Sequence, residues 1–410
     1  MPQKIQQCRI CGNSQLELVL DLGTQYLTGV FPASSDQHVN QGPLRLVKCH
    51  GEGFCGLLQL QHSYDLDEMY GENYGYRSGL NNAMMRHLDE KIQRILTQHS
   101  LPPNSLVIDI GANDGTTLRS YPESGLELVG VDPTSKKFEQ YFPKHATMIA
   151  DFFTADLIEA KFSDKKASIV TSFSMFYDLE DPMRFMRDIH SVLEEGGIWV
   201  FEQSYMPTML DMNSYDTACH EHLEYYAMKQ IAWMADRVGF SLIDVELNDV
   251  NGGSFSITAK KSSNIEHDAK VAALIEQEEQ AGLDTLTPYR EFAKRVDDTR
   301  TALIDFFDQA AREGKRVCAL GASTKGNVLL QYCGVTTTQI AQVGEVNEDK
   351  FDKYTPGTLL PIVPEAQMLD EGFDYHLVLP WHFRSFFLAS PHLKGKTLVF
   401  PLPEIELHVV

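Results

Sequence analysis

The sequence predicts an α/β protein of three domains, and three observations lead to this fold class. Between residues 106 and 260, buried-strand patterns alternate with helical patterns, which is typical of a parallel, doubly wound sheet. A second alternation begins at Arg316, after a polar helical stretch. The chain has 410 residues, more than a single domain usually holds. We therefore expect a small N-terminal module over residues 1–70, a Rossmann-like doubly wound domain over 71–262 and a smaller Rossmann-like α/β domain over 263–410.

The balance of charges excludes several classes of partner. Asp and Glu number 57 against 35 Lys and Arg, so the net charge is −22. Nucleic-acid backbones and anionic membranes repel such an acidic chain, so we expect neither as a partner, although a local basic pocket for a phosphorylated substrate is allowed. No apolar run reaches the roughly 18 residues that span a bilayer. Residues 1–7 lack the apolar segment of a secretory signal, so we expect a cytoplasmic protein.

The first 70 residues contain short strand-like runs that are broken by Gly, Pro and Cys. Four of the seven cysteines lie here, in two clusters. Two cysteine pairs brought together make a tetrahedral thiolate site, which suits structural zinc. The second pair is separated by five residues instead of two, so His50 is an alternative ligand, and free cysteines in a small core are the alternative without metal. The expected zinc ligands are Cys8, Cys11, Cys49 and Cys55.

The second domain is expected to begin with a helix over residues 78–100, whose apolar residues recur at helical spacing. Asp181 and Pro182 provide an N-cap and a first-turn proline for a later helix, which we expect Gly196 and Gly197 to end. Runs of apolar residues predict strands at 106–110, 128–131, 168–171, 198–201, 240–247 and 254–260. The last two are expected to form a pair.

The C-terminal third is expected to repeat the βα pattern on a smaller scale. Residues 262–314 are polar and rich in Glu, Ala, Lys and Asp, and they predict a helical connection. Residues 316–320 predict a strand. A Gly-containing turn follows it, and then a helix through Leu329 and Leu330. Further strands are expected at 376–379 and 397–400.

The turn after the first strand of the second domain predicts a ligand-binding loop. Its glycines, at positions 111 and 115, allow a ligand to approach the backbone closely. Asp114 stands where a dinucleotide-binding loop has its third glycine, and acidic side chains in this loop disfavour a pyrophosphate. They favour a ligand with a positive centre, such as the sulfonium and amino groups of S-adenosylmethionine (SAM). An NAD-binding variant of the fold and a loop without ligand are the alternatives.

Acidic and aromatic residues after the next strands fit the remainder of such a cofactor. Asp132 ends the second strand, where a carboxylate binds ribose hydroxyls in dinucleotide folds. Asp151 and Phe152 could contact the adenine amine and cover its ring. The expected cofactor-binding residues are Asp109, Gly111, Asn113, Asp114, Asp132, Asp151 and Phe152.

A dense group of proton-transfer side chains lies within residues 216–226. Two histidines, two glutamates and two tyrosines fall within seven residues. Histidine titrates nearest neutral pH and is the usual general base, so we interpret the cluster as catalytic. A second metal site and a solvated helix start are the alternatives. The pattern is not the metalloprotease HExxH, and His220 and His222 do not share a helix face.

A second Gly-containing loop, residues 321–327, follows the first strand of the C-terminal domain. Lys325 precedes Gly326, so the loop is not a GxxxxGK[ST] phosphate loop. Its backbone amides, hydroxyls and one lysine at a helix N-terminus could still hold a diphosphate. A tight βα turn without ligand is the alternative.

Taken together and in this order, the motifs resemble those of the nucleotide-sugar C-methyltransferases of deoxysugar biosynthesis, over essentially the whole chain. The matching segments are the two cysteine pairs, Tyr70-Gly71-Glu72-Asn73-Tyr74-Gly75-Tyr76, residues 110–115, 220–226, 251–254 and 321–327, and Pro401-Leu402-Pro403-Glu404. The collinear order is more specific than any single motif.

This resemblance implies a zinc-bound N-terminal module, a class I SAM-dependent methyltransferase domain and a C-terminal α/β domain that helps to hold the substrate, in a monomer. The implied substrate is a nucleoside-diphosphate 4-keto-6-deoxy sugar. A base removes the proton alpha to the ketone, and the resulting enolate attacks the methyl group of SAM, with C3 as the expected carbon. The resemblance leaves open whether the nucleotide is thymidine or guanosine diphosphate.

By the same resemblance, the base is His222, with Glu221 beside it. A family tyrosine falls on Tyr76 or Tyr74, and Tyr76 or His220 could donate a hydrogen bond to the developing oxyanion. The implied catalytic residues are therefore His222, Glu221, Tyr76 and His220. The implied substrate-binding residues are Tyr74, Cys219, Tyr225, Asn251, Ser323, Lys325 and Asn327.

Two positions depart from the family pattern. Cys219 stands where other members carry a tyrosine, and a thiol is a weak donor that cannot replace a phenol well. The orientation of the sugar, or the carbon that is methylated, could therefore differ. Phe176 stands where a histidine is commoner.

Three other functions compete with C-methylation. An O- or N-methyltransferase of a sugar or another small molecule needs the same cofactor loop but no base for an alpha proton. A catalytically inactive ligand-binding protein on this fold would not need the loop of residues 111–115 or the histidine cluster. An oxidoreductase that uses NAD is disfavoured by Asp114.

Overall fold

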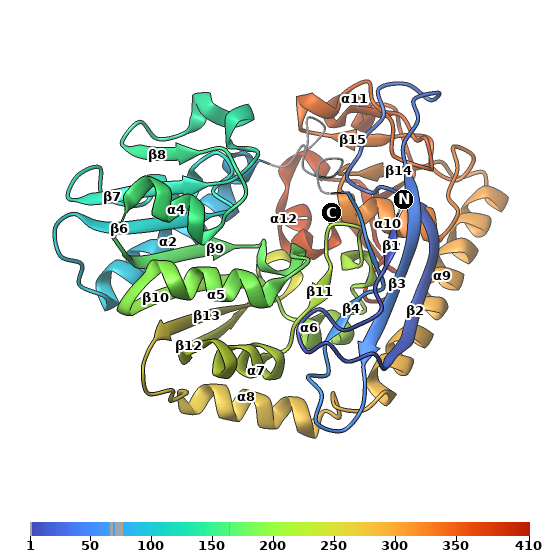
Figure 1. Cartoon of the computed structure of the whole chain (residues 1–410). Helices are drawn as coiled ribbons and strands as arrows, with labels where there is room; N and C mark the ends of the chain where they lie inside the picture. Colours follow the sequence, from blue (N-terminus) through green and yellow to red (C-terminus); the bar gives the residue numbers. More distant parts are fainter. Residues whose placement is uncertain (1, 66–68, 70–76, 164) are drawn as a thin grey trace.

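The computed structural model describes residues 2–65, 69, 77–163 and 165–410. Figure 1 shows the central sheet on one side of the molecule, with the N-terminal strands and the C-terminal sheet side by side on the other. Among the helices of these residues, none combines the length and the apolar character that crossing a membrane requires.

The central sheet has seven strands in the order β12–β13–β10–β9–β6–β7–β8. Neighbouring strands from β10 to β8 are parallel, and β13 and β12 are antiparallel additions at one edge. This confirms the doubly wound sheet and its terminal strand pair. The strands are β6 (Ser105–Ile110), β7 (Leu126–Val131), β8 (Ala146–Ile149), β9 (Ala167–Phe173), β10 (Leu193–Ser204), β12 (Phe240–Asn248) and β13 (Ser254–Lys261).

Helices cover both faces of this sheet because successive strand residues point to opposite faces. On one face, Val107 and Val200 pack with Ile92 and Ile95 of α2. On the other, Trp199 packs with the apolar side of α5. The helices of this domain are α2 (Asn82–Gln98), α3 (Thr116–Arg119), α4 (Ala155–Phe162), α5 (Pro182–Val192), α6 (Met206–Asp211) and α7 (Met228–Val238).

The predicted end of α5 is wrong by several residues. Asp181 caps the helix as expected, since its carboxylate accepts a hydrogen bond from the backbone N–H of Arg184 at 2.9 Å. However, the helix ends at Val192, and β10 begins at once with the buried Leu193. Gly196 lies inside β10 with φ +81°, where the register with β9 shifts. The glycine therefore serves a strand irregularity instead of a helix C-cap.

The N-terminal strands form a four-stranded antiparallel sheet in the order β11–β4–β3–β2. Strands β2 and β3 are longer than the predicted short runs. Gly23 lies inside β2 and Pro43 lies inside β3, and both stand at irregularities of the pairing instead of ending their strands. The strands are β2 (Leu16–Tyr26), β3 (Gln41–Cys49), β4 (Leu58–Leu60) and β11 (Glu224–Tyr225), with β1 (Gln3–Lys4) and β5 (His62–Ser63) as a separate pair. Strand β11 belongs to the histidine cluster, so the central domain contributes a strand to the N-terminal sheet.

The C-terminal third starts with helices α8 (Ala269–Gln280) and α9 (Thr287–Arg312) and continues as a six-stranded sheet in the order β16–β15–β14–β17–β18–β19. Only β19 is antiparallel to its neighbour, so the predicted second βα domain is confirmed. Its strands are β14 (Val317–Leu320), β15 (Val343–Glu345), β16 (Ile362–Pro364), β17 (Tyr375–Val378), β18 (Thr397–Phe400) and β19 (Glu406–Val409). Its helices are α10 (Thr324–Tyr332), α11 (Glu365–Leu369) and α12 (Arg384–Ala389), and both α9 and α10 contact β2.

Candidate active site

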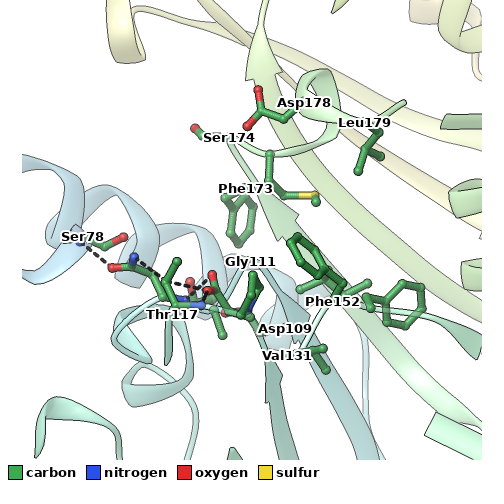
Figure 2. Close-up of a pocket in the computed structure, with 18 of the residues that line it drawn as sticks. Ser78, Asp109, Gly111, Thr117, Val131, Phe152, Phe173, Ser174, Asp178 and Leu179 are labelled. Carbon is green, nitrogen blue, oxygen red and sulfur yellow. Dashed lines mark hydrogen bonds between the residues drawn. The ribbon is translucent and has the colours of Figure 1, made fainter. Parts of the chain in front are cut away.

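A cavity of about 210 Å³ opens at the carboxyl ends of β6, β7 and β9. Ligands bind at this edge of open α/β sheets, where the order of the strands reverses. Figure 2 shows Asp109, Gly111 and Thr117 on the lower side of the cavity and Ser174, Asp178 and Leu179 on the upper side. The predicted loop therefore faces a segment that follows β9.

Asp109 is the most deeply buried acid in this cavity. One of its carboxylate oxygens, Oδ1, accepts a hydrogen bond from Thr171 Oγ1 at 2.6 Å, whereas Oδ2 is buried with no hydrogen-bond partner among the described residues. Burial raises the pKa of Asp109 to about 7, against the opposing effect of the Thr171 hydroxyl. A buried carboxylate oxygen without a partner is costly, so it indicates a place for a ligand donor.

The loop after β6 is tied to the end of β7. The backbone N–H of Asn113 donates to Asp132 Oδ2 at 3.0 Å, and the backbone N–H of Thr134 donates to Oδ1 at 2.6 Å. Gly111 adopts φ +75°, a left-handed conformation that favours glycine. Gly111, Asn113 and Asp132 all line the cavity as predicted.

Two of the predicted cofactor residues do not line this cavity. Asp114 turns away, and its carboxylate accepts hydrogen bonds from Thr116 and from the backbone N–H of Gly79 at 3.1 Å. Asp151 is exposed, and its carboxylate accepts from the backbone N–H of Phe152 at 2.7 Å. Phe152 itself lines the cavity. Asp114 thus joins the segment before α2 to the loop.

Sequence reasoning missed the upper wall of the cavity. Phe173 ends β9 and Leu179 lies beyond it, and both line the cavity. The predicted strand β9 could have indicated these residues. The carboxyl end of a central parallel strand lies at the same edge of the sheet as the ends of β6 and β7. The missed lining residues are Ser78, Met84, Leu88, Ile110, Ala112, Thr117, Val131, Pro133, Thr134, Phe153, Phe173, Ser174, Met175, Asp178, Leu179, Glu180 and Phe185.

His222 lies beside a second, much smaller cavity, which Tyr177, Glu224 and Tyr225 also line. Its Nδ1 atom is 2.8 Å from the carbonyl oxygen of Thr217, which assigns the ring proton to Nδ1. No hydrogen bond to a described residue occupies Nε2, so its lone pair is available to take up a proton. Burial lowers the pKa of His222 to about 3, and the nearby Lys325 acts in the same direction. The ring is therefore neutral, as a general base must be.

The side chains around His222 differ in what they contact. The hydroxyl of Tyr225 donates to the carbonyl oxygen of His222 at 3.0 Å, so this side chain supports the backbone of the segment. Glu221 Oε1 lies where a Cβ on Gly29 would stand, and its Oε2 is buried without a hydrogen-bond partner among the described residues. Cys219 is buried, and burial raises the pKa of its thiol well above the usual value.

The predicted role of His220 as a donor to the oxyanion disagrees with its position. The ring is fully buried, 3.5 Å from both Thr28 Oγ1 and the carbonyl oxygen of Gly42, and Tyr64 packs edge-on against it. Burial lowers the pKa of His220 to about 4. His220 lies in a turn that precedes His222, and the two rings have different surroundings: His220 enters the N-terminal sheet region, whereas His222 lines the small cavity.

The second Gly-containing loop forms a junction between domains instead of an open phosphate site. Ser323 caps α10, with its hydroxyl accepting from the backbone N–H of Gly326 at 3.0 Å. The buried Asn327 donates its amide to the carbonyl oxygen of Thr28 at 2.7 Å. Lys325 Nζ donates to the carbonyl oxygen of Asn251 at 3.0 Å, which joins the loop to the central domain.

Lys325 also contributes a positively charged side chain to this junction. Burial lowers the pKa of Lys325, against the opposing effect of the nearby Asp216 carboxylate. Asp216 also accepts a hydrogen bond from Trp381 Nε1 at 2.8 Å, and its second oxygen is without a hydrogen-bond partner among the described residues. His222, Lys325 and Asp216 are thus electrostatic neighbours from two domains.

Tyr74 and Tyr76 lie outside the described residues.

The four predicted zinc ligands are brought together by the N-terminal fold. The sulfur atoms of Cys8, Cys11, Cys49 and Cys55 all lie within 4.8 Å of one another. Tetrahedral zinc with Zn–S distances of about 2.3 Å requires sulfurs about 3.8 Å apart, and the Cys8–Cys55 and Cys11–Cys49 pairs are at 3.5 Å. Asn13 Nδ2 also donates to Cys49 Sγ at 3.2 Å, as befits a thiolate ligand. The donor set fits Zn²⁺, and with four protein ligands the site is structural.

The large cavity fits the predicted cofactor by charge. Asp109, Asp132, Asp178 and Glu180 line it, and the described lining residues include neither Lys nor Arg. An acidic wall of this kind suits the ammonium and sulfonium groups of SAM and opposes a pyrophosphate. Apolar side chains such as Phe152 and Leu179 complete the walls.

Comparison with protein families assigns three regions of the chain. A zinc binding domain matches residues 8–70, a methyltransferase domain matches residues 80–245, and a C-methyltransferase C-terminal domain matches residues 249–403. The three matches follow the zinc cluster, the central sheet and the C-terminal sheet in turn.

Individual proteins are similar to the whole chain or to part of it. The C-methyltransferase NovU of Streptomyces niveus is 26% identical over 408 residues, which cover 98% of this chain and 96% of that protein. The carboxy-S-adenosyl-L-methionine synthase of Campylobacter fetus is 26% identical over 113 residues, which cover 27% of this chain and 48% of that protein. Among solved structures, the CurJ carbon methyltransferase aligns with a TM-score of 0.34 at 12% identity, covering 44% of this chain and 54% of that one.

Proposed function

Because the chain belongs to the C-methyltransferases that combine a zinc-binding, a methyltransferase and a C-methyltransferase C-terminal domain, we propose that its substrate is a nucleoside-diphosphate 4-keto-6-deoxy sugar, methylated at C3. SAM, when bound in the large cavity, supplies the methyl group. The sugar class is supported by the resemblance of the collinear motifs described above. C3 is the first carbon to test, because it is one of the two positions next to a 4-ketone.

The observation that carries the proposal is the state of His222. Its Nδ1–H is directed to the carbonyl oxygen of Thr217, and its Nε2 lone pair is unoccupied among the described contacts. In the proposed reaction Nε2 removes the proton alpha to the ketone, and the electron pair of the C–H bond moves into an enolate. That pair then forms the new C–C bond to the methyl group, whose bond to sulfur breaks.

Stabilisation of the enolate falls to other groups in this proposal. A base as weak as a buried histidine needs a donor to the developing oxyanion. His220 is excluded by its contacts with Thr28 and Gly42, so Tyr76 is retained as the proposed donor. The positive charge of Lys325 faces the same region and would further stabilise negative charge.

We expect the enzyme to exchange the alpha proton of its substrate with solvent before methyl transfer. Incubation with nucleoside-diphosphate 4-keto-6-deoxyhexoses in D₂O without SAM should add one deuterium, and its position, determined by mass spectrometry and NMR, should be C3. Addition of SAM should replace the exchangeable position by a methyl group. SAM binding without exchange on either thymidine- or guanosine-linked ketosugars, but with methylation of a heteroatom, would instead indicate an O- or N-methyltransferase.

The affinity for SAM should rise with pH because of Asp109. Its pKa is raised to about 7 by burial, so below pH 7 a proton must leave before the carboxylate can pair with a cation. Proton release on binding increases affinity by up to about tenfold per pH unit, so the Kd should fall between pH 5.5 and 7 and level off above. Isothermal titration calorimetry should show this slope, and Asp109→Asn should remove it. An equal slope in Asp109→Asn would contradict the assignment.

A further inference from the structure

The first cysteine pair carries a buried arginine that reaches into the active-site region. Arg9 lies between the ligands Cys8 and Cys11, and its side chain is only 3% exposed. Its guanidinium donates to the carbonyl oxygen of Leu60 at 2.7 Å and to Ser63 Oγ at 3.0 Å. Five donors in a rigid plane let one arginine bind several acceptors in this way.

The same guanidinium faces two glutamates of the central domain. Arg9 Nε is 3.4 Å from Glu180 Oε2 and 3.6 Å from Glu224 Oε1. Glu180 lines the large cavity, and Glu224 lines the small cavity together with His222. The arginine of the metal-binding turn is therefore bound to one residue from each of the two cavities.

Glu224 is the more unusual of the two acids. Its side chain is fully buried, and neither of its carboxylate oxygens has a hydrogen-bond partner among the described residues. Burial raises the pKa of Glu224 well above its usual value, whereas Arg9 acts to lower it. A buried acid without hydrogen bonds is destabilising on its own, so Glu224 depends on the positive charge of Arg9 beside it.

We propose that Arg9 is a positioning residue, which through Glu224 fixes the segment that carries His222 against the N-terminal sheet. The backbone supports this link, because Glu224 pairs with Gln59 of β4 and the N–H of Leu60 donates to the carbonyl oxygen of Leu223 at 2.8 Å. Arg9 also contacts β4 directly, with its backbone N–H donating to Gln59 Oε1 at 3.1 Å. The zinc turn, β4 and β11 thus form one connected support for the base.

The inference rests on the proposed role of His222 as the base, so its first test is independent of the substrate. In protein with ¹⁵N-labelled histidines, the ring signals of His222 are identified by their loss in His222→Gln. Arg9→Met and Glu224→Gln should each shift these signals, because both change the support of the segment. Arg45→Met is the matched control, since Arg45 is an exposed residue of the same sheet that pairs with Asp21 at 2.9 Å.

The second test measures exchange of the alpha proton. Arg9→Met and Glu224→Gln should each lower its rate at least tenfold, and the double variant should be no slower than the slower single variant, because both act through one contact. The zinc content should stay at one per chain throughout. Unshifted His222 signals in both single variants, or rate losses that multiply in the double variant, overturn the proposal. If Arg9→Met does not fold, Glu224→Gln alone decides, since its shape is unchanged. Absence of exchange in the wild-type protein would instead refute the proposed function.

Discussion

His222→Gln is expected to lower the rates of alpha-proton exchange and of methyl transfer by about 10²- to 10⁴-fold, the usual contribution of a general base. Glutamine can still donate a hydrogen bond to the carbonyl oxygen of Thr217, so the segment should keep its place. It offers no basic nitrogen at the position of Nε2. Single-turnover methyl transfer and deuterium incorporation, both followed by mass spectrometry, measure the two rates.

The pH dependence gives this experiment a second readout. Burial and Lys325 lower the pKa of His222 to about 3, so the ring stays neutral from pH 8 down to pH 5. A base loses activity only when pH falls below its pKa, so the exchange rate should not decline with the titration of His222 in this range. His145→Gln, at an exposed position, is the control and should retain the wild-type rate. Normal exchange in His222→Gln would move the base to another residue.

The distinction between the two histidines could not be drawn from the sequence. His220 and His222 have the same chemistry, and the segment has no helical or strand pattern long enough to orient them. His220 meets Thr28, Gly42 and Tyr64, which lie far away in the sequence, in the N-terminal region. One histidine thereby enters the N-terminal core and the other faces the cavity. Long-range contacts of this kind leave almost no local signal.

The cofactor cavity was easier to anticipate because its main parts are local. A buried strand, a turn with glycine and a helix start fix the loop after β6, and the end of the adjacent parallel strand necessarily brings Asp132 beside it. Asp114 was misjudged for the opposite reason. One oxygen of its carboxylate accepts from the backbone N–H of Gly79, which approaches from a segment before α2, and the other oxygen accepts from Thr116.

Cys55→Ser is expected to abolish zinc binding and to lower the melting temperature by more than about 10 °C. Structural zinc contributes its binding free energy to folding, on the order of 10 kcal/mol or more, which is comparable with the whole stability of a domain. The three remaining sulfurs would lose the ion that offsets their mutual repulsion, since all four lie within 4.8 Å of one another in the wild-type protein. Metal content by mass spectrometry and melting by calorimetry measure the two effects.

The matched control is Cys333→Ser, the same change at a buried cysteine outside the cluster, which should keep one zinc per chain. The effect of Cys55→Ser should extend to catalysis, because Gln230 of α7 donates to the carbonyl oxygen of Cys55 at 2.9 Å and β4 follows this cysteine directly. Loss of zinc should therefore loosen the strand against which the His222 segment pairs, and exchange should fall together with metal content. A metal-free protein with the melting temperature and the alpha-proton exchange rate of the wild type would show that the cysteines only contribute to packing. The N-terminal sheet would then have to support the base without a metal.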